Sequence, residues 1–118
     1  MENGAWIKRV SPRLTPPSLK DNTADVDRLV KGLRKDLGGK EVSVDFSLID
    51  GVTRSLRNHD YKVYAALFQE HDCWHLIDVF SAQGGNGIYG LALDLGSSTL
   101  VLRLMDLETG RIMDETSF

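Results

Sequence analysis

Apolar residues in the first third of the chain recur at helical spacing. The repeat follows i, i+3, i+4, i+7 and i+11 and consists of Val26, Leu29, Val30, Leu33 and Leu37. This spacing gives one apolar stripe on a helix of about four turns. Asn22 or Thr23 can cap the start of the helix, and Gly38-Gly39 supplies a stop signal. The pattern therefore predicts an amphipathic helix after Thr23.

The middle of the chain changes period twice. Val42, Val44 and Phe46 alternate with polar residues, which predicts a half-buried strand. The apolar spacing then becomes helical at Leu48, Ile49, Val52 and Leu56. Two further runs, residues 61–69 and 74–82, flank Glu70-His71-Asp72-Cys73 and predict an antiparallel hairpin with a four-residue loop. The predicted fold class is α+β, a small antiparallel sheet with two helices.

Two breaks in composition divide the chain. All three prolines lie between Ser11 and Asn22, and because proline favours extended backbone, residues 1–22 are predicted to be an extended linker arm. Residues 81–87 are rich in glycine and small polar residues, which indicates a hinge. We therefore expect a middle α+β domain over residues 23–87 and a separate terminal segment over residues 88–118.

Charge and composition exclude several partners. The net charge of −3 offers no basic field to hold a polyanion, so nucleic acid is not expected. The longest apolar run, Tyr64 to Phe68, is far shorter than the ~20 residues that span a bilayer, and residues 1–10 lack an apolar signal-peptide core. We expect no membrane partner and a cytoplasmic location. The single cysteine, Cys73, cannot form an internal disulfide or hold a four-thiolate cluster.

One turn carries the candidate chemistry. An apolar strand over residues 89–95 contains Asp94, and the residues that follow it before the next apolar run are Gly96, Ser97, Ser98 and Thr99. The three hydroxyls and the N–H groups of the turn can donate to phosphate oxygens, and the Asp94 carboxylate can face a hydrated Mg²⁺. A plain hairpin with a polar tip is the alternative interpretation.

This turn resembles the first phosphate loop of the actin, heat-shock-protein and sugar-kinase superfamily of ATPases. Taken with the arm over residues 14–22, the helix start at residues 25–29 and the Asp-Leu-Glu-Thr-Gly turn at residues 106–110, it resembles the reductive activators of corrinoid proteins. The resemblance implies that residues 88–118 are the opening hairpin of an actin-like (ribonuclease H-like) ATPase domain. The family more usually has Thr-Thr-Thr where this chain has Ser97-Ser98-Thr99.

By this resemblance, the parent protein passes an electron from a [2Fe–2S] ferredoxin domain to a Co(II) corrinoid protein and uses ATP and Mg²⁺ to assist the step. The ferredoxin cysteines, the second phosphate loop and the adenosine-binding segment are absent from these 118 residues. We therefore expect a non-catalytic fragment that binds no cofactor by itself and that couples or docks domains. Its implied partners are the corrinoid protein and the remaining ATPase and ferredoxin domains.

Two other functions stay open from the sequence. The chain could be a stand-alone α+β protein-interaction domain, or a fragment of another actin-fold ATPase or kinase. The apolar strands over residues 89–106 need cover in either case. We therefore predict that they fold back onto the middle domain or pair with a second copy in a homodimer.

Two weaker candidates have plainer explanations. His71, Cys73 and His75 alternate and offer imidazole and thiolate ligands for Zn²⁺, but they straddle the predicted loop, where alternation fails. A loop tip with a half-buried cysteine is the favoured interpretation. Two small basic groups could dock an acidic surface, although a solvated face is favoured. They are Arg54, Arg57 and Lys62, and Lys31, Arg34 and Lys35.

Overall fold

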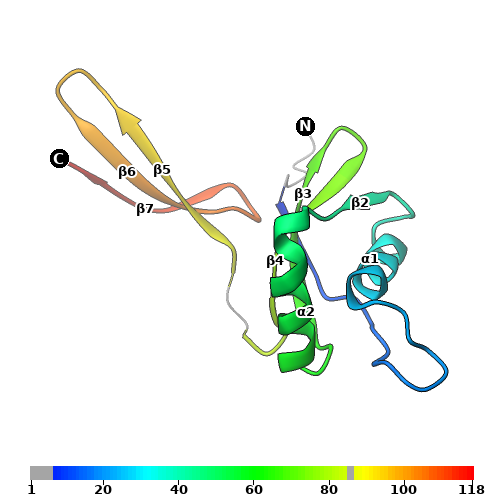
Figure 1. Cartoon of the computed structure of the whole chain (residues 1–118). Coiled ribbons are helices and arrows are strands. Elements are labelled where there is room, and N and C mark those ends of the chain that lie inside the picture. Colours follow the sequence, from blue (N-terminus) through cyan, green and yellow to red (C-terminus); the bar gives the residue numbers. More distant parts are fainter. Residues whose placement is uncertain (1–6, 85–86) are drawn as a thin grey trace. The chain divides into compact units, whose positions relative to one another are not determined.

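The chain folds into two compact units, residues 8–85 and residues 86–118. The computed structural model describes residues 7–84 and 87–118 (Figure 1). In these ranges no helix is long and apolar enough to cross a bilayer. The position of one unit relative to the other is not determined.

The first unit is a four-stranded sheet with two helices. Along the chain its elements are β1 (Ile7–Val10), α1 (Asp25–Asp36), β2 (Glu41–Ser43), a 3₁₀ turn (Phe46–Leu48), α2 (Ile49–Asn58), β3 (Val63–Glu70) and β4 (Cys73–Ser81). The strand order is β1-β3-β4-β2, and β3 and β4 pair antiparallel. Strand β2 pairs parallel to β4 instead, because α2 and β3 return the chain before β4 begins. The sheet predicted to be antiparallel is therefore mixed.

The helices cover the sheet and enclose one core. Helix α2 packs on β4, and α1 packs on α2 and β2 (Figure 1). The largest fully buried side chains are Leu29, Leu33, Leu56, Leu67 and Val63. Each such side chain contributes about 1.5–3 kcal/mol relative to an exposed one. The apolar stripe that predicted α1 therefore faces the core.

Both helices end in the same backbone motif. In α1 the N–H of Gly39 donates to the carbonyl of Arg34 at 2.8 Å, and in α2 the N–H of Tyr61 donates to that of Leu56 at 2.8 Å. This six-to-one bond is the Schellman motif, which needs a left-handed residue after the cap. Gly38 (φ 70°) fills that position in α1, whereas Asp60 (φ 55°) fills it in α2. Helix α2 therefore ends on a residue whose Cβ makes the left-handed conformation unfavourable.

The start of α1 differs from the prediction. Ala24 is the N-cap residue and makes no side-chain capping bond, so the prediction that Asn22 or Thr23 caps the helix is wrong. The hydroxyl and N–H of Thr23 donate instead to Asp21 Oδ1, at 2.7 and 3.2 Å. This local bond turns Thr23 toward the preceding segment and away from the free N–H groups of the helix.

The segment predicted as an extended arm is packed onto the first unit. Its first described residues, Ile7–Val10, form the edge strand β1 beside β3, which the sequence pattern did not predict. The Ser11 hydroxyl donates to the carbonyl of Val63 at 3.2 Å, and Leu14 packs against the core. A Cβ on Gly32 of α1 would lie 2.6 Å from Leu14 Cδ2, so the arm approaches the helix closely at a glycine.

The second unit is a three-stranded antiparallel sheet. Its strands are β5 (Tyr89–Leu95), β6 (Leu100–Asp106) and β7 (Arg111–Ser117), in that order. The turn between β6 and β7 places Gly110 at φ 78°, where glycine has no Cβ penalty. Strand β7 extends the predicted hairpin by one strand.

One side of this second sheet is a row of leucines. Register places Leu91 opposite Leu104, Leu93 opposite Leu102 and Leu95 opposite Leu100. We call these six residues the leucine face. Leu91, Leu93 and Leu95 are 70%, 59% and 73% exposed. No residue between 87 and 118 is buried, so this unit has no core of its own.

Candidate functional site

The predicted phosphate-loop residues lie together at one tip of the second unit. Gly96, Ser97, Ser98 and Thr99 form the turn between β5 and β6, and all four are exposed. The N–H of Gly96 donates to the carbonyl of Thr99 at 2.8 Å and closes the turn. The three hydroxyls are therefore presented from one short turn, as a phosphate loop requires.

Asp94 lies two residues before this turn, on the side of the sheet opposite the leucine face. Its carboxylate is 3.9 Å from the Arg103 guanidinium, which also bonds Glu115 on β7 at 2.5 Å. Asp94 remains 68% exposed. A single open turn surrounds a phosphate from one side only, so the arrangement can supply part of a phosphate site and no contact for a base. The role of these five residues remains a prediction.

The weak metal candidates lie on and beside β4. His71 stands in a two-residue turn between β3 and β4, shorter than the four-residue loop predicted, and has φ 59°. Cys73 and His75 lie on β4, where the His75 ring stacks on Phe68 at 4.9 Å and its Nε2 is 3.7 Å from Glu70. In the described part of the chain, no three His, Cys, Asp or Glu residues converge for a metal ion.

The first unit contains a polar cluster that the sequence pattern did not predict. It surrounds Arg28 on α1, whose side chain is only 6% exposed. One guanidinium nitrogen of Arg28 donates to the carbonyl of Thr15 at 2.7 Å and to Asp21 Oδ2 at 2.8 Å. The other donates to the carbonyl of Thr23 at 3.1 Å. Arg28 thus clamps three points of the arm to the helix.

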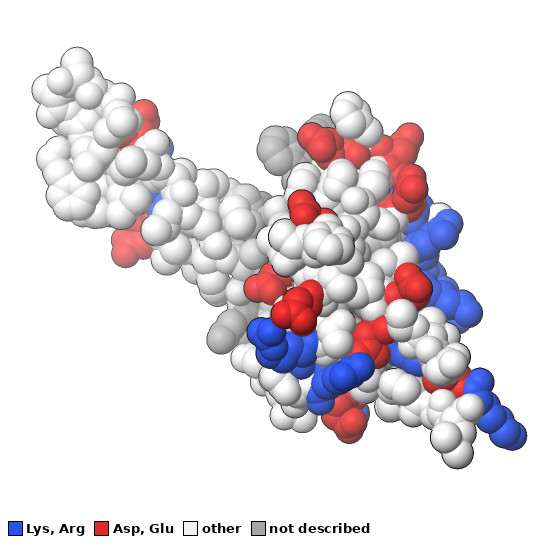
Figure 2. Space-filling view, in the orientation of Figure 1, with Lys and Arg blue, Asp and Glu red and all other residues white. Residues whose placement is uncertain are grey.

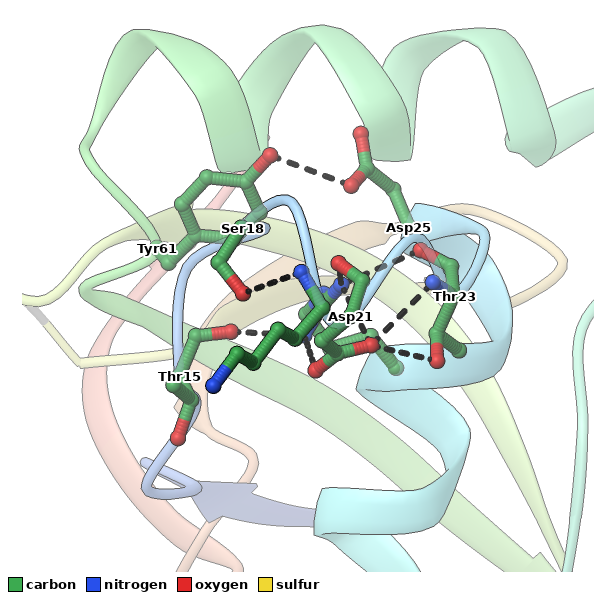
Figure 3. Close-up of polar contacts among 8 residues, drawn as sticks. Thr15, Ser18, Asp21, Thr23, Asp25 and Tyr61 are labelled. Carbon is green, nitrogen blue, oxygen red and sulfur yellow. Dashed lines mark hydrogen bonds and ion pairs between the residues drawn. The ribbon is translucent and has the colours of Figure 1, made fainter.

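Asp21 is the anionic part of this clamp. It closes a short turn with Ser18, through two backbone bonds of 3.0 and 3.1 Å (Figure 3). Hydrogen bonds from Arg28, and then from Thr23, hold the pKa of Asp21 far below its usual range. The carboxylate is therefore ionised at neutral pH, and its contribution to the clamp is lost only under acid conditions.

A second polar contact joins the two helices. Asp25, at the start of α1, is 8% exposed, and it accepts a hydrogen bond from the Tyr61 hydroxyl at 3.1 Å (Figure 3). It also accepts one from Arg57 Nε at 3.0 Å. Burial, with the Asp25 carboxylate beside it, raises the pKa of Tyr61. A buried carboxylate with two donors is a satisfied group, so this contact fixes the crossing of α1 and α2. Arg57 therefore forms an ion pair while its side chain stays 69% exposed, which agrees with the solvated face that the sequence favoured.

Sequence patterns give little warning of either contact. Arg28 occupies a polar position next to the apolar stripe, and its acceptors include two backbone carbonyls, which no residue pattern displays. The signal that could have found the clamp is Asp21, two residues before Thr23 and seven before Arg28. Together the contacts hold the arm, α1 and α2 as one ordered body.

The fold is one found in reductive activators. A solved structure of a "reductive activator for corrinoid, iron-sulfur protein" matches all of this chain with a TM-score of 0.75 and 24% sequence identity. The match covers 100% of this chain and 19% of that chain, so this chain spans about a fifth of the length of the structure it matches. The likeness includes both units.

Residues 6–84 match the family described as the RACo linker region. This range is most of the chain, so the chain belongs to the RACo linker family. Among the curated proteins, none matches it. The resemblance to corrinoid reductive activators and the α+β fold class, both predicted from the sequence, are confirmed.

Proposed function

We propose that this chain is a non-catalytic linking part of an ATP-dependent reductive activator of corrinoid proteins. The observation that carries the proposal is the family match over residues 6–84. The intact activator would transfer an electron from a [2Fe–2S] ferredoxin domain to a Co(II) corrinoid protein in the cytoplasm. This chain would bind no cofactor by itself, and its direct partners would be the flanking domains and the corrinoid protein.

The two units would have different tasks in such an activator. Residues 8–85 have a closed core and a clamped arm, which suits a spacer that holds the ferredoxin domain at a fixed distance. Residues 88–118 would open the actin-like ATPase domain, with Asp94, Gly96, Ser97, Ser98 and Thr99 contacting ATP phosphates or Mg²⁺. The exposed turn and the uncovered leucine face are both consistent with a sheet completed by further chain.

The match to the solved activator favours this proposal over the two other functions. The likeness covers 100% of this chain, whereas a stand-alone interaction domain would need to share only residues 8–85. A fragment of a kinase or of another actin-fold ATPase would not be expected to match the RACo linker region over residues 6–84.

The first test measures the activity of the longer protein that carries this chain. Reduction of a purified Co(II) corrinoid protein is followed by absorbance, with a reductant and with or without Mg-ATP. We expect Co(I) to accumulate only when ATP is present. Failure to reduce the corrinoid protein, by a preparation with a full [2Fe–2S] content, would contradict the proposed function.

The second test addresses the linking role. Arg28→Ala removes the clamp in the longer protein, and Arg54→Ala is the matched control because Arg54 makes only an exposed pair with Asp50. We expect Arg28→Ala to slow corrinoid reduction while cluster content and ATP hydrolysis stay unchanged. Equal reduction rates in the two variants would show that the order of the arm is irrelevant to electron delivery.

A further inference from the structure

The arm and one side of α1 form a pocket between them. This pocket has a volume of about 170 Å³ and lies beside the clamp. Four of its lining residues are cationic: Arg13, Arg28, Lys31 and Lys35. Asp21 is the pocket's single acidic residue. The pocket therefore has a large excess of positive charge on a chain whose net charge is −3.

The excess charge is not consumed by internal ion pairs. Asp21 pairs with Arg28 at 2.8 Å, which neutralises one cation. Arg13, Lys31 and Lys35 are exposed, and their side chains have no hydrogen bond or ion pair to any residue in the ranges 7–84 and 87–118. Lys31 and Lys35 lie at i and i+4 on the same side of α1. Three cations without a partner among the described residues thus line one pocket.

Arg28 lines the pocket through its positive charge. Its residue is 7% exposed, and its Nε is buried without a hydrogen-bond partner in the described part of the chain. This nitrogen is enclosed by the protein and is not open to the pocket, so Arg28 contributes its charge to the pocket and no free hydrogen-bond donor. Asp21 and backbone carbonyls already occupy the other two nitrogens of this guanidinium, so a ligand in the pocket would contact Arg13, Lys31 and Lys35 instead.

Figure 2 shows where this charge lies on the surface. Lys and Arg side chains gather along the edge of the first unit at which Figure 1 places α1. A second pocket on the same helix is also lined by Lys31, Arg34 and Lys35. The basic group that the sequence assigned to a solvated face therefore borders two concave sites.

We propose that the pocket between the arm and α1 binds a free oxyanion of the phosphate class. Ammonium groups of Lys31 and Lys35 and the guanidinium of Arg13 would approach a tetrahedral anion from different directions, and each charge-assisted bond is a strong one. A bound anion would join Arg13 of the arm to two lysines of α1, and so would tighten the arm on the helix. The site does not depend on the activator assignment.

The test follows the amide signals of the 118-residue chain by NMR while inorganic phosphate is added at constant ionic strength. We expect saturable shifts at the pocket-lining residues Thr15, Thr23 and Gly32. Lys31→Ala combined with Lys35→Ala should weaken binding about tenfold or more, because two charged donors are lost. Both lysines are exposed on a helix and alanine is the best helix former, so this variant should stay folded.

Lys62→Ala is the matched control, since Lys62 is exposed on the same unit and does not line this pocket. It should bind phosphate as the unaltered chain does. Shifts that grow linearly without saturation, or a loss of binding equal in the control and the double variant, would overturn the proposal. Saturation by an acidic peptide but not by phosphate would also overturn it and would assign the pocket to a protein partner.

Discussion

The two units of this chain bury their apolar residues to very different extents. In residues 8–85, helices α1 and α2 cover the sheet, and five large side chains are completely buried. In residues 87–118, three hydrogen-bonded strands leave every residue at least partly exposed. Hydrogen-bonded strands alone do not make a stable domain in water, because an apolar face must also be covered. The difference indicates a self-sufficient first unit and an incomplete second one.

The largest expected effect comes from opening the core of the first unit. Leu33→Ala should lower the free energy of unfolding by about 2–5 kcal/mol, because Leu33 is fully buried and its removal leaves a cavity. Leu93→Ala, the same change on a side chain that is 59% exposed, should cost far less. Chemical denaturation followed by circular dichroism measures both. Equal costs would mean that the two units are equally well packed.

The leucine face predicts self-association. We expect the chain to form homodimers through residues 89–106 at high concentration, unless this face folds back onto the first unit. Leu91→Lys combined with Leu93→Lys should weaken dimerisation by about tenfold or more for each leucine removed from the interface. Analytical ultracentrifugation measures the association constant.

Leu19→Lys is the control for that experiment, because Leu19 is an exposed leucine that lies in the arm of the first unit. It should leave association unchanged. A chain that remains monomeric at high concentration while its β5 and β6 strands are disordered would contradict both dimerisation and folding back.

The contact between the helices predicts a smaller effect. Tyr61→Phe should destabilise the first unit by about 1 kcal/mol, since Asp25 loses one of its two donors and keeps Arg57. The raised pKa of Tyr61 also means that stability is fully present below about pH 10 and is lost as the pH rises and the hydroxyl ionises. Thermal melts at pH 7 measure the destabilisation by the substitution, and melts above pH 10 measure the loss of stability at alkaline pH. If Tyr61→Phe loses as much stability at alkaline pH as the unaltered chain does, Tyr61 is excluded as the source of that loss.

Acid should affect the clamp of the first unit. The pKa of Asp21 is lowered in the folded chain, so the stability it contributes is present above about pH 4 and falls as the pH drops below that value. Asp21→Asn should flatten the acid dependence of unfolding. The change is read from denaturation midpoints between pH 2 and pH 7, and an unaltered slope would contradict the assigned role of Asp21.

The smallest expected effects are at the ends of the helices. Asp60→Gly should stabilise the chain by about 0.5–1 kcal/mol, because glycine adopts the left-handed conformation of Asp60 without a Cβ penalty. Gly38→Ala at the equivalent position of α1 should destabilise it by a similar or larger amount. If both substitutions stabilise the chain, or both destabilise it, one of the two helices does not end in a Schellman motif.

The sequence predicted those helices and strands that pack one face against the core, because such packing makes apolar residues recur at a regular spacing. The apolar stripe from Val26 to Leu37 gave α1, and the runs around residues 61–69 and 74–82 gave the β3–β4 hairpin. Strand β7 was missed because Arg111–Ser117 contains few apolar residues, all exposed, and joins the sheet through backbone bonds to β6. Strand β1 was missed for a similar reason, because the charged residues Lys8 and Arg9 interrupt its apolar pattern.

The candidate sites divide in a similar way. The turn at residues 94–99 could be predicted because its chemistry is concentrated in consecutive residues. The Arg28 clamp and the basic pocket could not, since they bring together residues from Arg13 to Lys35 through one close approach of the arm at Gly32. Such a site depends on the packing of an extended segment, which has no period of its own.

Amide hydrogen exchange on the 118-residue chain, at a concentration low enough to keep it monomeric, tests the difference between the units most directly. We predict that amides of β3, β4 and α1 exchange only through global unfolding, whereas those of β5, β6 and β7 exchange much faster through local opening. Equal protection across both sheets in the monomer would contradict the conclusion that the second unit is incomplete.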